Sequence, residues 1–148
     1  MAHAVMLDTN VYNDPTYKDK ALSIRRLRVS SVVVQELLVV AKQEERKALI
    51  GEFNEKVSVG IGFVPNGQDW IEVGVCLAKL HQERIYDFGK LSKGEVNLLV
   101  RDALLARTAM QANAVLITAD TNDFSKIKMI FKRLKFNSPS SFFGTRTK

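Results

Sequence analysis

Two short apolar segments that each end at an aspartate constrain the fold of this chain more than any other feature. Residues 4–7 precede Asp8, and residues 114–119 precede Asp120. Short apolar runs of this kind are typical of strands buried on both faces of a parallel sheet. Because such sheets bind ligands beyond the carboxyl ends of their strands, both aspartates are candidate site residues. Aspartate is also a common turn and capping residue, so each one alone is weak evidence.

The rest of the chain alternates between helical patterns and further short strands. The expected elements, in chain order, are a short helix from residue 15 to about 27, a brief strand over 29–31, a helical segment over 31–56 with a break near 43–46, a strand over 60–65, a helix capped by Asn66 or Asp69, and a helix over 92–112. The last begins with Ser92 and Glu95 at the spacing of a capping box. Short strands that alternate with longer helices predict an α/β fold, with helices on both faces of a central, mainly parallel sheet.

The length of 148 residues corresponds to a single domain over residues 1–148. The composition, 46% hydrophobic and 26% charged, is that of a globular protein. The apolar stretches are too short to span a membrane, and residues 1–7 lack the cationic start of a signal peptide. The single cysteine, Cys76, cannot form an internal disulfide. We therefore expect a cytoplasmic protein that does not contact membranes.

The net charge of +6 is concentrated at the C-terminal end. Residues 124–148 contain seven basic residues and no acid, whereas residues 1–123 contain 15 basic residues against 16 acidic ones. This basic C-terminal segment mixes lysines with phenylalanines, a combination that can bind phosphates and stack on bases. Because Ile127, Ile130 and Leu134 fit one amphipathic face, we favour packing on the domain, with residues 134–136 as a final edge strand.

Two further acids lie within apolar helical stripes. At helical spacing Glu36 is flanked only by valines, and Asp102 only by leucines and an alanine: Val32, Val33, Val39 and Val40 for the first, and Leu98, Leu99, Leu105 and Ala106 for the second. A carboxylate that faces a core is strongly destabilising unless it is paired. Each acid could form its own ion pair, Glu36 with an arginine of residues 25–28 and Asp102 with a lysine, since Arg101 and Arg107 lie on other faces of the helix.

Alternatively, Glu36 and Asp102 converge with Asp8 and Asp120 at one edge of the sheet. Carboxylates that share a site repel each other, and the simplest counterion is one or two Mg²⁺ or Mn²⁺ ions, which prefer carboxylate and water oxygens. Carboxylate-held divalent ions most often serve phosphodiester hydrolysis, which favours a nucleic-acid substrate. The sequence contains no Gly-rich phosphate loop, no Gly-x-Ser-x-Gly elbow and no His-Glu-x-x-His motif, so rival chemistries lack their residues.

These acids stand in four segments that together resemble the motifs of PIN-domain ribonucleases. The segments are Val5-Met6-Leu7-Asp8-Thr9-Asn10-Val11, Ser31-Val32-Val33-Val34-Gln35-Glu36-Leu37, Asp102-Ala103-Leu104-Leu105-Ala106-Arg107-Thr108-Ala109, and Val115-Leu116-Ile117-Thr118-Ala119-Asp120 with Phe124. They follow the family's order over residues 3–124. The 18 positions from Asp102 to Asp120 are similar to the spacing in VapC-type toxins of bacteria and archaea.

The resemblance implies a three-layer, Rossmann-like sandwich and endonucleolytic cleavage of RNA with Mg²⁺ or Mn²⁺. It implies four residues that bind metal and carry catalysis: Asp8, Glu36, Asp102 and Asp120. Thr9, Asn10 and Thr118 would position those ligands or their water. Asp123 is an additional candidate metal ligand that could share or replace the role of Asp120. A VapC-type toxin would also have a cognate antitoxin as its partner.

Basic residues near the four motifs are candidates for contact with the RNA backbone. They are Arg25, Arg26, Arg28, Arg107 and Lys126. The alternatives are that they form ordinary solvated surface, or that an arginine pairs with one of the acids before metal binds. A domain of this kind often self-associates, so we also expect a homodimer.

Three other functions remain open at this stage. The first is an RNA-processing nuclease that is not a toxin. The second is an inactive PIN-like module that binds RNA or acts as a scaffold, although all four acids are present. The third is a phosphatase of the haloacid dehalogenase type with Asp8 as nucleophile, which would need a second aspartate where this chain has Asn10.

Overall fold

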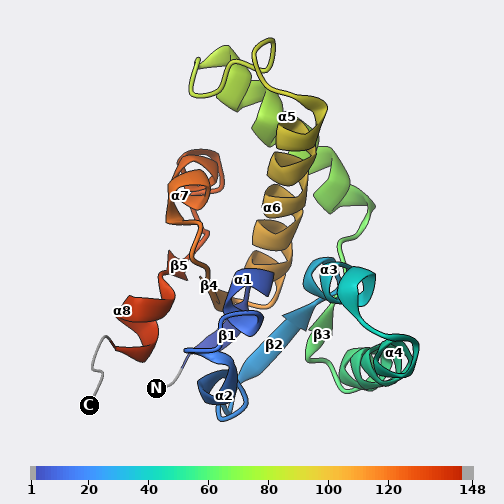
Figure 1. Ribbon diagram of the computed structural model, residues 1–148. Coiled ribbons are helices and arrows are strands. Elements are labelled where there is room, and N and C mark those ends of the chain that lie inside the picture. The colour runs from blue at the N-terminus through green and yellow to red at the C-terminus, as the bar shows by residue number, and fades with distance from the viewer. Residues whose placement is uncertain (1–2, 145–148) are drawn as a thin grey trace.

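The computed structural model describes residues 3–144 and contains a five-stranded sheet between helices (Figure 1). The strands are β1 (Ala4–Leu7), β2 (Leu27–Ser30), β3 (Gly62–Phe63), β4 (Ala114–Ile117) and β5 (Phe136–Asn137). They lie in the order β3-β2-β1-β4-β5, and every pair of neighbours is parallel. The expected α/β fold with a central parallel sheet is therefore confirmed.

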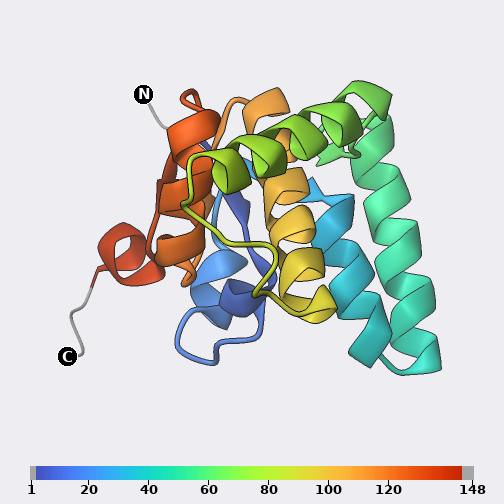
Figure 2. The same ribbon diagram turned by 90° about the horizontal axis from the view of Figure 1, so that it is seen from above.

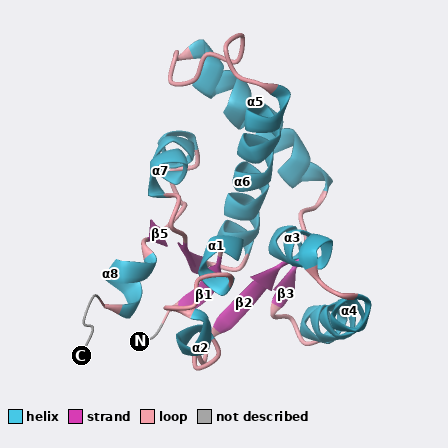
Figure 3. Ribbon diagram, in the orientation of Figure 1, coloured by secondary structure: helices cyan, strands magenta, loops and turns pink. Residues whose placement is uncertain are grey.

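Eight helices connect and cover these strands within the described residues (Figure 3). They are α1 (Thr9–Tyr12), α2 (Lys18–Ala21), α3 (Ser31–Val40), α4 (Gln43–Ser58), α5 (Gly67–Gln82), α6 (Lys93–Gln111), α7 (Thr121–Ile130) and α8 (Pro139–Phe143). The capping box at Ser92 opens α6, as expected, and a second one at Asn66 opens α5. No helix among residues 3–144 is both long and apolar enough to cross a membrane.

The structure corrects several element boundaries. The helix expected over residues 15–27 is reduced to the single turn of α2, while Asp8 caps a short helix, α1, that the sequence did not indicate. The long helical segment breaks at Ala41 and Lys42, where the backbone is extended, rather than near residues 43–46. Glu45 explains this position, because its side chain accepts from the backbone N–H of Lys42 and so caps the start of α4.

The central strand β1 is buried on both faces because its alternate residues pack into two different layers. Ala4 and Met6 join the larger core, which includes residues of α3, α5, α6 and α7. Val5 and Leu7 join a smaller core with Val11 of α1 and residues of the α2 region. Figure 2 shows α5 lying across α6 within the first of these helical layers. The three-layer arrangement buries both faces of β1 and leaves the ends of its neighbouring strands available for a site.

A buried ion pair holds α5 against α6. Asp69, only 1% exposed, accepts from Arg107 Nε at 2.9 Å and from Gln111 Nε2. The same carboxylate accepts from the backbone N–H of Asn66 at 2.9 Å, which closes the cap of α5. The guanidinium of Arg107 also lies 5.5 Å from the ring centroid of Phe131. Asp69 thus links two helices and a cap in one network.

Replacing Asp69 with Ala is expected to lower the free energy of unfolding by about 3 kcal/mol, because it leaves the Arg107 guanidinium partly buried without its partner. Urea unfolding followed by circular dichroism measures this. Glu72→Ala is the matched control, since Glu72 lies on the same helix and its carboxylate accepts an exposed hydrogen bond from Gln68, one turn away. Equal losses for the two variants would show that the pair with Arg107 contributes nothing specific.

Candidate active site

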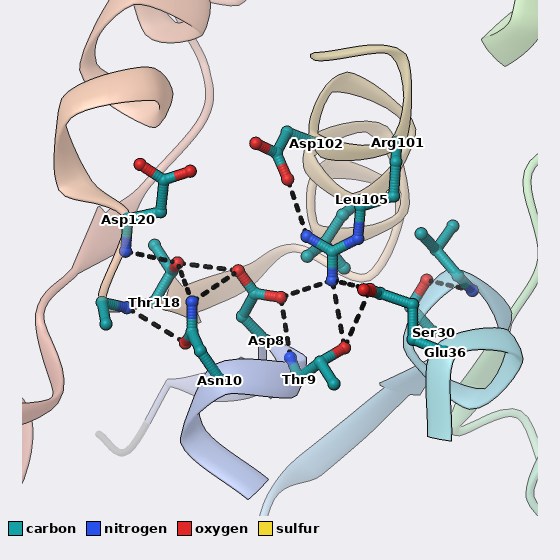
Figure 4. Close-up of polar contacts among 12 residues, drawn as sticks. Asp8, Thr9, Asn10, Ser30, Glu36, Arg101, Asp102, Leu105, Thr118 and Asp120 are labelled. Atoms are coloured by element: carbon teal, nitrogen blue, oxygen red, sulfur yellow. Dashed lines mark hydrogen bonds and ion pairs between the residues drawn. The ribbon is translucent and has the colours of Figure 1, made fainter. Parts of the chain in front are cut away.

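The first acid, Asp8, leaves the carboxyl end of β1 beside the end of β4. Leu7 and Ile117 are paired in register, so Asp8 and Thr118 emerge side by side. The Thr118 hydroxyl donates to Oδ2 of Asp8 at 2.7 Å, and the backbone N–H of Thr9 donates to Oδ1 at 2.7 Å (Figure 4). Asp8 is 1% exposed. Its carboxylate is therefore fixed in one orientation by the strand ends themselves.

Asn10 ties the two strand ends together. Its Nδ2 donates to Oδ2 of Asp8 at 3.3 Å, and its Oδ1 accepts from the backbone N–H of Ala119 at 3.1 Å. Thr118 in turn accepts from the backbone N–H of Asp120 at 3.0 Å. Asn10 and Thr118 thus both donate hydrogen bonds to the Asp8 carboxylate.

Arg101 lies at the centre of three acids that come from different elements. Its Nη2 pairs with Oδ1 of Asp8 at 2.6 Å and also with Oε1 of Glu36, while its Nη1 pairs with Oδ1 of Asp102 at 2.6 Å. Thr9 joins the group, because its hydroxyl donates to Oε1 of Glu36 at 2.9 Å. The alternative of two separate ion pairs, Glu36 with an arginine of residues 25–28 and Asp102 with a lysine, is wrong. Both acids pair with Arg101.

The position of Arg101 corrects the expectation that it lies on another face of its helix. Its backbone is one residue from Asp102, but its long side chain crosses to the neighbouring face, and all three acids meet its two terminal nitrogens (Figure 4). Its side chain is 17% exposed. Burial acts to lower the pKa of this guanidinium, but hydrogen bonds and charge from Asp8 and Asp102 outweigh it and raise that pKa.

A second acidic group adjoins the first and shares Asp102 with it. One oxygen each from Asp102, Asp120 and Asp123 lies within 4.8 Å of the others. Asp120 caps α7 by accepting from the backbone N–H of Asp123, and Asp123 accepts from the hydroxyl of Tyr86. The five acids thus form one continuous cluster at the carboxyl edge of the sheet.

Burial and the neighbouring charges raise the pKa of two of these carboxylates, Asp102 and Asp120. Burial, with further contributions from the charges of Asp8 and Asp120, raises the pKa of Asp102 to about 7 in spite of its pairing with Arg101. Burial and then the neighbouring Asp123 raise the pKa of Asp120. Burial and the hydrogen bond to Asp123 raise the pKa of Tyr86, which keeps its proton. The pairing with Arg101 therefore does not offset burial and charge repulsion at Asp102.

The donor set fits a divalent cation. Oxygens that share one Mg²⁺ are at most about 4.2 Å apart, given metal–oxygen distances near 2.1 Å. The oxygens of Asp102, Asp120 and Asp123 lie within 4.8 Å of one another, so small side-chain rotations would bring them to that spacing. All the candidate ligands are carboxylates, which hard cations such as Mg²⁺ and Mn²⁺ prefer.

Comparison with protein-family models gives one match, to the PIN domain, over residues 5–129. The chain belongs to the PIN-domain family. Curated protein sequences provide no match. The PIN domain begins inside β1 and ends near the close of α7, so it contains all five clustered acids.

Solved structures with a similar fold include VapBC complexes. One is VapBC from Salmonella typhimurium bound to DNA, with a TM-score of 0.56 and 19% identity over 93% of this chain and 98% of that one. Others are VapBC2 from Rickettsia felis bound to a promoter DNA fragment (TM-score 0.54, 19% identity, 91% and 98% covered) and VapBC-1 from nontypeable Haemophilus influenzae (TM-score 0.54, 20% identity, 91% and 97% covered). At this identity the likeness shows that this PIN domain shares their fold.

The basic residues proposed to contact RNA are scattered over the PIN domain. Lys126 lies close to the acids, with its Nζ 4.6 Å from the ring centroid of Tyr86. Arg107 pairs instead with Asp69. Arg25 and Arg26 precede β2 and therefore lie at the amino edge of the sheet, opposite the acids. Arg28 lies within β2, beside Met6 of β1. Lys126 is linked to the acidic cluster through Tyr86, whose hydroxyl donates to Asp123.

Two residues of the site had no role assigned from the sequence. The position of Arg101 directly before Asp102 in the sequence could have indicated a contact between the two. Its contacts with Asp8 and Glu36 depend on side-chain packing in the folded protein. Tyr86 stands in the connection between α5 and α6, where no periodicity marks a contact with Asp123. Only the folded chain brings that connection over the first turn of α7.

Proposed function

We propose that this PIN domain is a metal-dependent endoribonuclease that binds Mg²⁺ or Mn²⁺ through Asp8, Glu36, Asp102 and Asp120, with Asp123 as an additional ligand. The observation that carries the proposal is the convergence of five acids at one edge of the sheet, three with oxygens within 4.8 Å of each other. A purely structural cluster would need matching cations, but one arginine serves three of these acids. The excess negative charge favours a site built to receive a cation.

The chain's own residues would orient the ligands and control their protons. Thr118 and the backbone N–H of Thr9 hold the two oxygens of Asp8, and Asn10 keeps the ends of β1 and β4 together. The hydroxyl of Tyr86 donates a hydrogen bond to the carboxylate of Asp123. When bound, a divalent ion supplies an activated water and neutralises charge on the leaving oxygen of the phosphodiester. Asp102, with its raised pKa, would release its proton when it becomes a ligand.

A protein partner accompanies this proposal. The resemblance to VapC-type toxins and the VapBC names of structures with the same fold support a cognate antitoxin. The surface supports it as well, because Leu22, Val39 and Val40 are exposed, and Leu22 and Val40 line a cavity between the α2 region and α4. A solvent-facing cluster of large apolar side chains marks a protein contact. We also propose a homodimer and a cytoplasmic location.

An RNA-cleavage assay tests the proposed activity. The purified protein is incubated with a mixed-sequence RNA in the presence of Mn²⁺ or Mg²⁺, and end-labelled products are separated on a gel. Cleavage is expected with either ion, should stop when EDTA removes the metal, and should return when Mn²⁺ is added in excess. RNA binding without cleavage at any divalent concentration would contradict the nuclease and favour the RNA-binding module. A non-toxin processing nuclease would cleave RNA but have no antitoxin.

A further inference from the structure

We propose that Arg101 is a built-in counterion, which occupies the acidic site in the metal-free protein and must release its carboxylates before a divalent ion can bind. This inference rests on the proposed metal site and goes beyond it by assigning a competitor within the chain. The guanidinium contacts Asp8, Glu36 and Asp102, each from a different element. No other ion pair of the described residues involves any of the five clustered acids.

The competition follows from the atoms involved. Arg101 takes Oδ1 of Asp8, Oε1 of Glu36 and Oδ1 of Asp102, three of the oxygens that a cation at this cluster would use. A metal ion on these oxygens would lie within a few Å of the guanidinium, and the two cations would repel each other at that distance. Metal binding to the three carboxylates therefore favours the departure of Arg101.

The contacts of Arg101 suit a residue that leaves. Its Nε is buried and has no hydrogen-bond partner among the described residues, so the bound position is not fully satisfied. Beside it lies a cavity of about 420 Å³ that Arg101 itself lines, together with Ser31, Gln35, Trp70 and Asn97. This space can receive the guanidinium, and the amide oxygens of Gln35 and Asn97 can accept its hydrogen bonds. A rotation of one side chain would open the acids without moving the backbone.

Without metal, the same arginine stabilises the fold. Asp8 and Asp102 are buried, and carboxylates in such positions destabilise a protein when their counterion is removed. Arg101 thus keeps the acidic cluster assembled until a metal ion replaces it. The exchange of one cation for another is what distinguishes this role from that of a permanent structural ion pair.

Mn²⁺ affinity is the decisive measurement, made by titration calorimetry on the metal-free full chain at pH 8. Arg101→Met keeps the length of the aliphatic side chain and removes the charge. It is expected to bind Mn²⁺ at least about tenfold more tightly than the wild type, a difference of about 1.4 kcal/mol. Lys126→Met is the matched control, because Lys126 lies close to the acids but its ammonium group contacts the Tyr86 ring. Its dissociation constant should change less than about twofold, as expected for a charge screened by solvent.

Thermal unfolding gives a second readout. The metal-free Arg101→Met variant should unfold at a lower temperature than the wild type, and saturating Mn²⁺ should remove the difference. If this variant does not fold, Arg101→Lys replaces it, since a single ammonium group cannot bridge three carboxylates as the guanidinium does. That variant should also bind Mn²⁺ more tightly than the wild type, but by a smaller factor.

The outcomes separate this inference from the proposed function. Equal or weaker Mn²⁺ binding by the folded Arg101 variants overturns the counterion role and leaves the metal site intact. A similar gain in affinity for Lys126→Met also overturns it, because the effect would then be one of general charge. If neither the wild type nor the variants bind Mn²⁺, the metal-dependent nuclease itself is contradicted.

Discussion

Asp8→Asn is expected to lower the rate of RNA cleavage by about a thousandfold or more, because it weakens the most rigidly held ligand of the cluster. The amide keeps the shape of the carboxylate but loses its charge and one acceptor oxygen. Thr9, Asn10 and Thr118 all donate hydrogen bonds to the carboxylate of Asp8, so none of them supplies an oxygen in place of the lost one in this arrangement. Initial rates of cleavage of one labelled RNA, at saturating Mn²⁺, measure the effect.

The control for this variant is Asp19→Asn, which makes the same chemical change on the exposed helix α2. Its cleavage rate should equal that of the wild type. Asp8→Asn should still fold and bind RNA, because the substituted side chain fills the same volume. If it cleaves RNA at an undiminished rate, the acids at this edge of the sheet do not form the catalytic site.

The framework of the fold could be predicted because the apolar runs and capping residues in the sequence indicate the same strands and helices that the buried sheet contains. Residues 4–7 and 114–117 are apolar at successive positions, as strands covered on both faces require, and they are neighbours in the sheet. Asp8 and Asp120 follow them directly, so parallel pairing alone brings both acids to one edge. Ser92 and Glu95 likewise determine where α6 begins, independently of the rest of the fold.

The details that could not be predicted depend on tertiary contacts. The turn of α1 forms because Asp8 accepts from the backbone N–H of Thr9, a cap that no apolar periodicity announces. The basic C-terminal segment did form a helix that packs on the domain through Phe124 and Ile127, and its final strand is at Phe136–Asn137. Residues 145–148 of that segment lie outside the described residues.

Within the site, the acids were easier to anticipate than their counterion. Glu36 and Asp102 stand out because their helical neighbours are all apolar, which is a property of the sequence alone. The partner of such an acid is chosen by distance in the folded protein, and a side chain as long as arginine reaches across a helix face. The nearby sequence therefore pointed to residues 25–28, whereas the folded chain uses Arg101.

Mn²⁺ binding is expected to weaken about tenfold for each pH unit below pH 7, because Asp102 must lose its proton to become a ligand. Burial and the neighbouring acids raise the pKa of Asp102 to about 7 in the metal-free protein. Above that pH the carboxylate is already ionised, and this contribution to the pH dependence disappears. Calorimetric titrations between pH 5 and pH 8.5 should therefore show a slope that levels off near neutrality, and about a hundredfold weaker binding at pH 5 than at pH 8.5.

The raised pKa of Asp102 also makes the free energy of unfolding depend on pH, in the direction opposite to that of Mn²⁺ affinity. In the unfolded chain Asp102 titrates near pH 3.9, so between about pH 4 and pH 7 only the folded protein holds this proton. The free energy of unfolding of the metal-free protein should accordingly fall as the pH rises through this window, and saturating Mn²⁺ should reverse the loss at pH 8. Asp102→Asn removes the titrating group, so its contribution to both pH dependences should vanish in that variant. A wild-type Mn²⁺ affinity that does not change between pH 5 and pH 8 would show that no acid with a raised pKa takes part in binding.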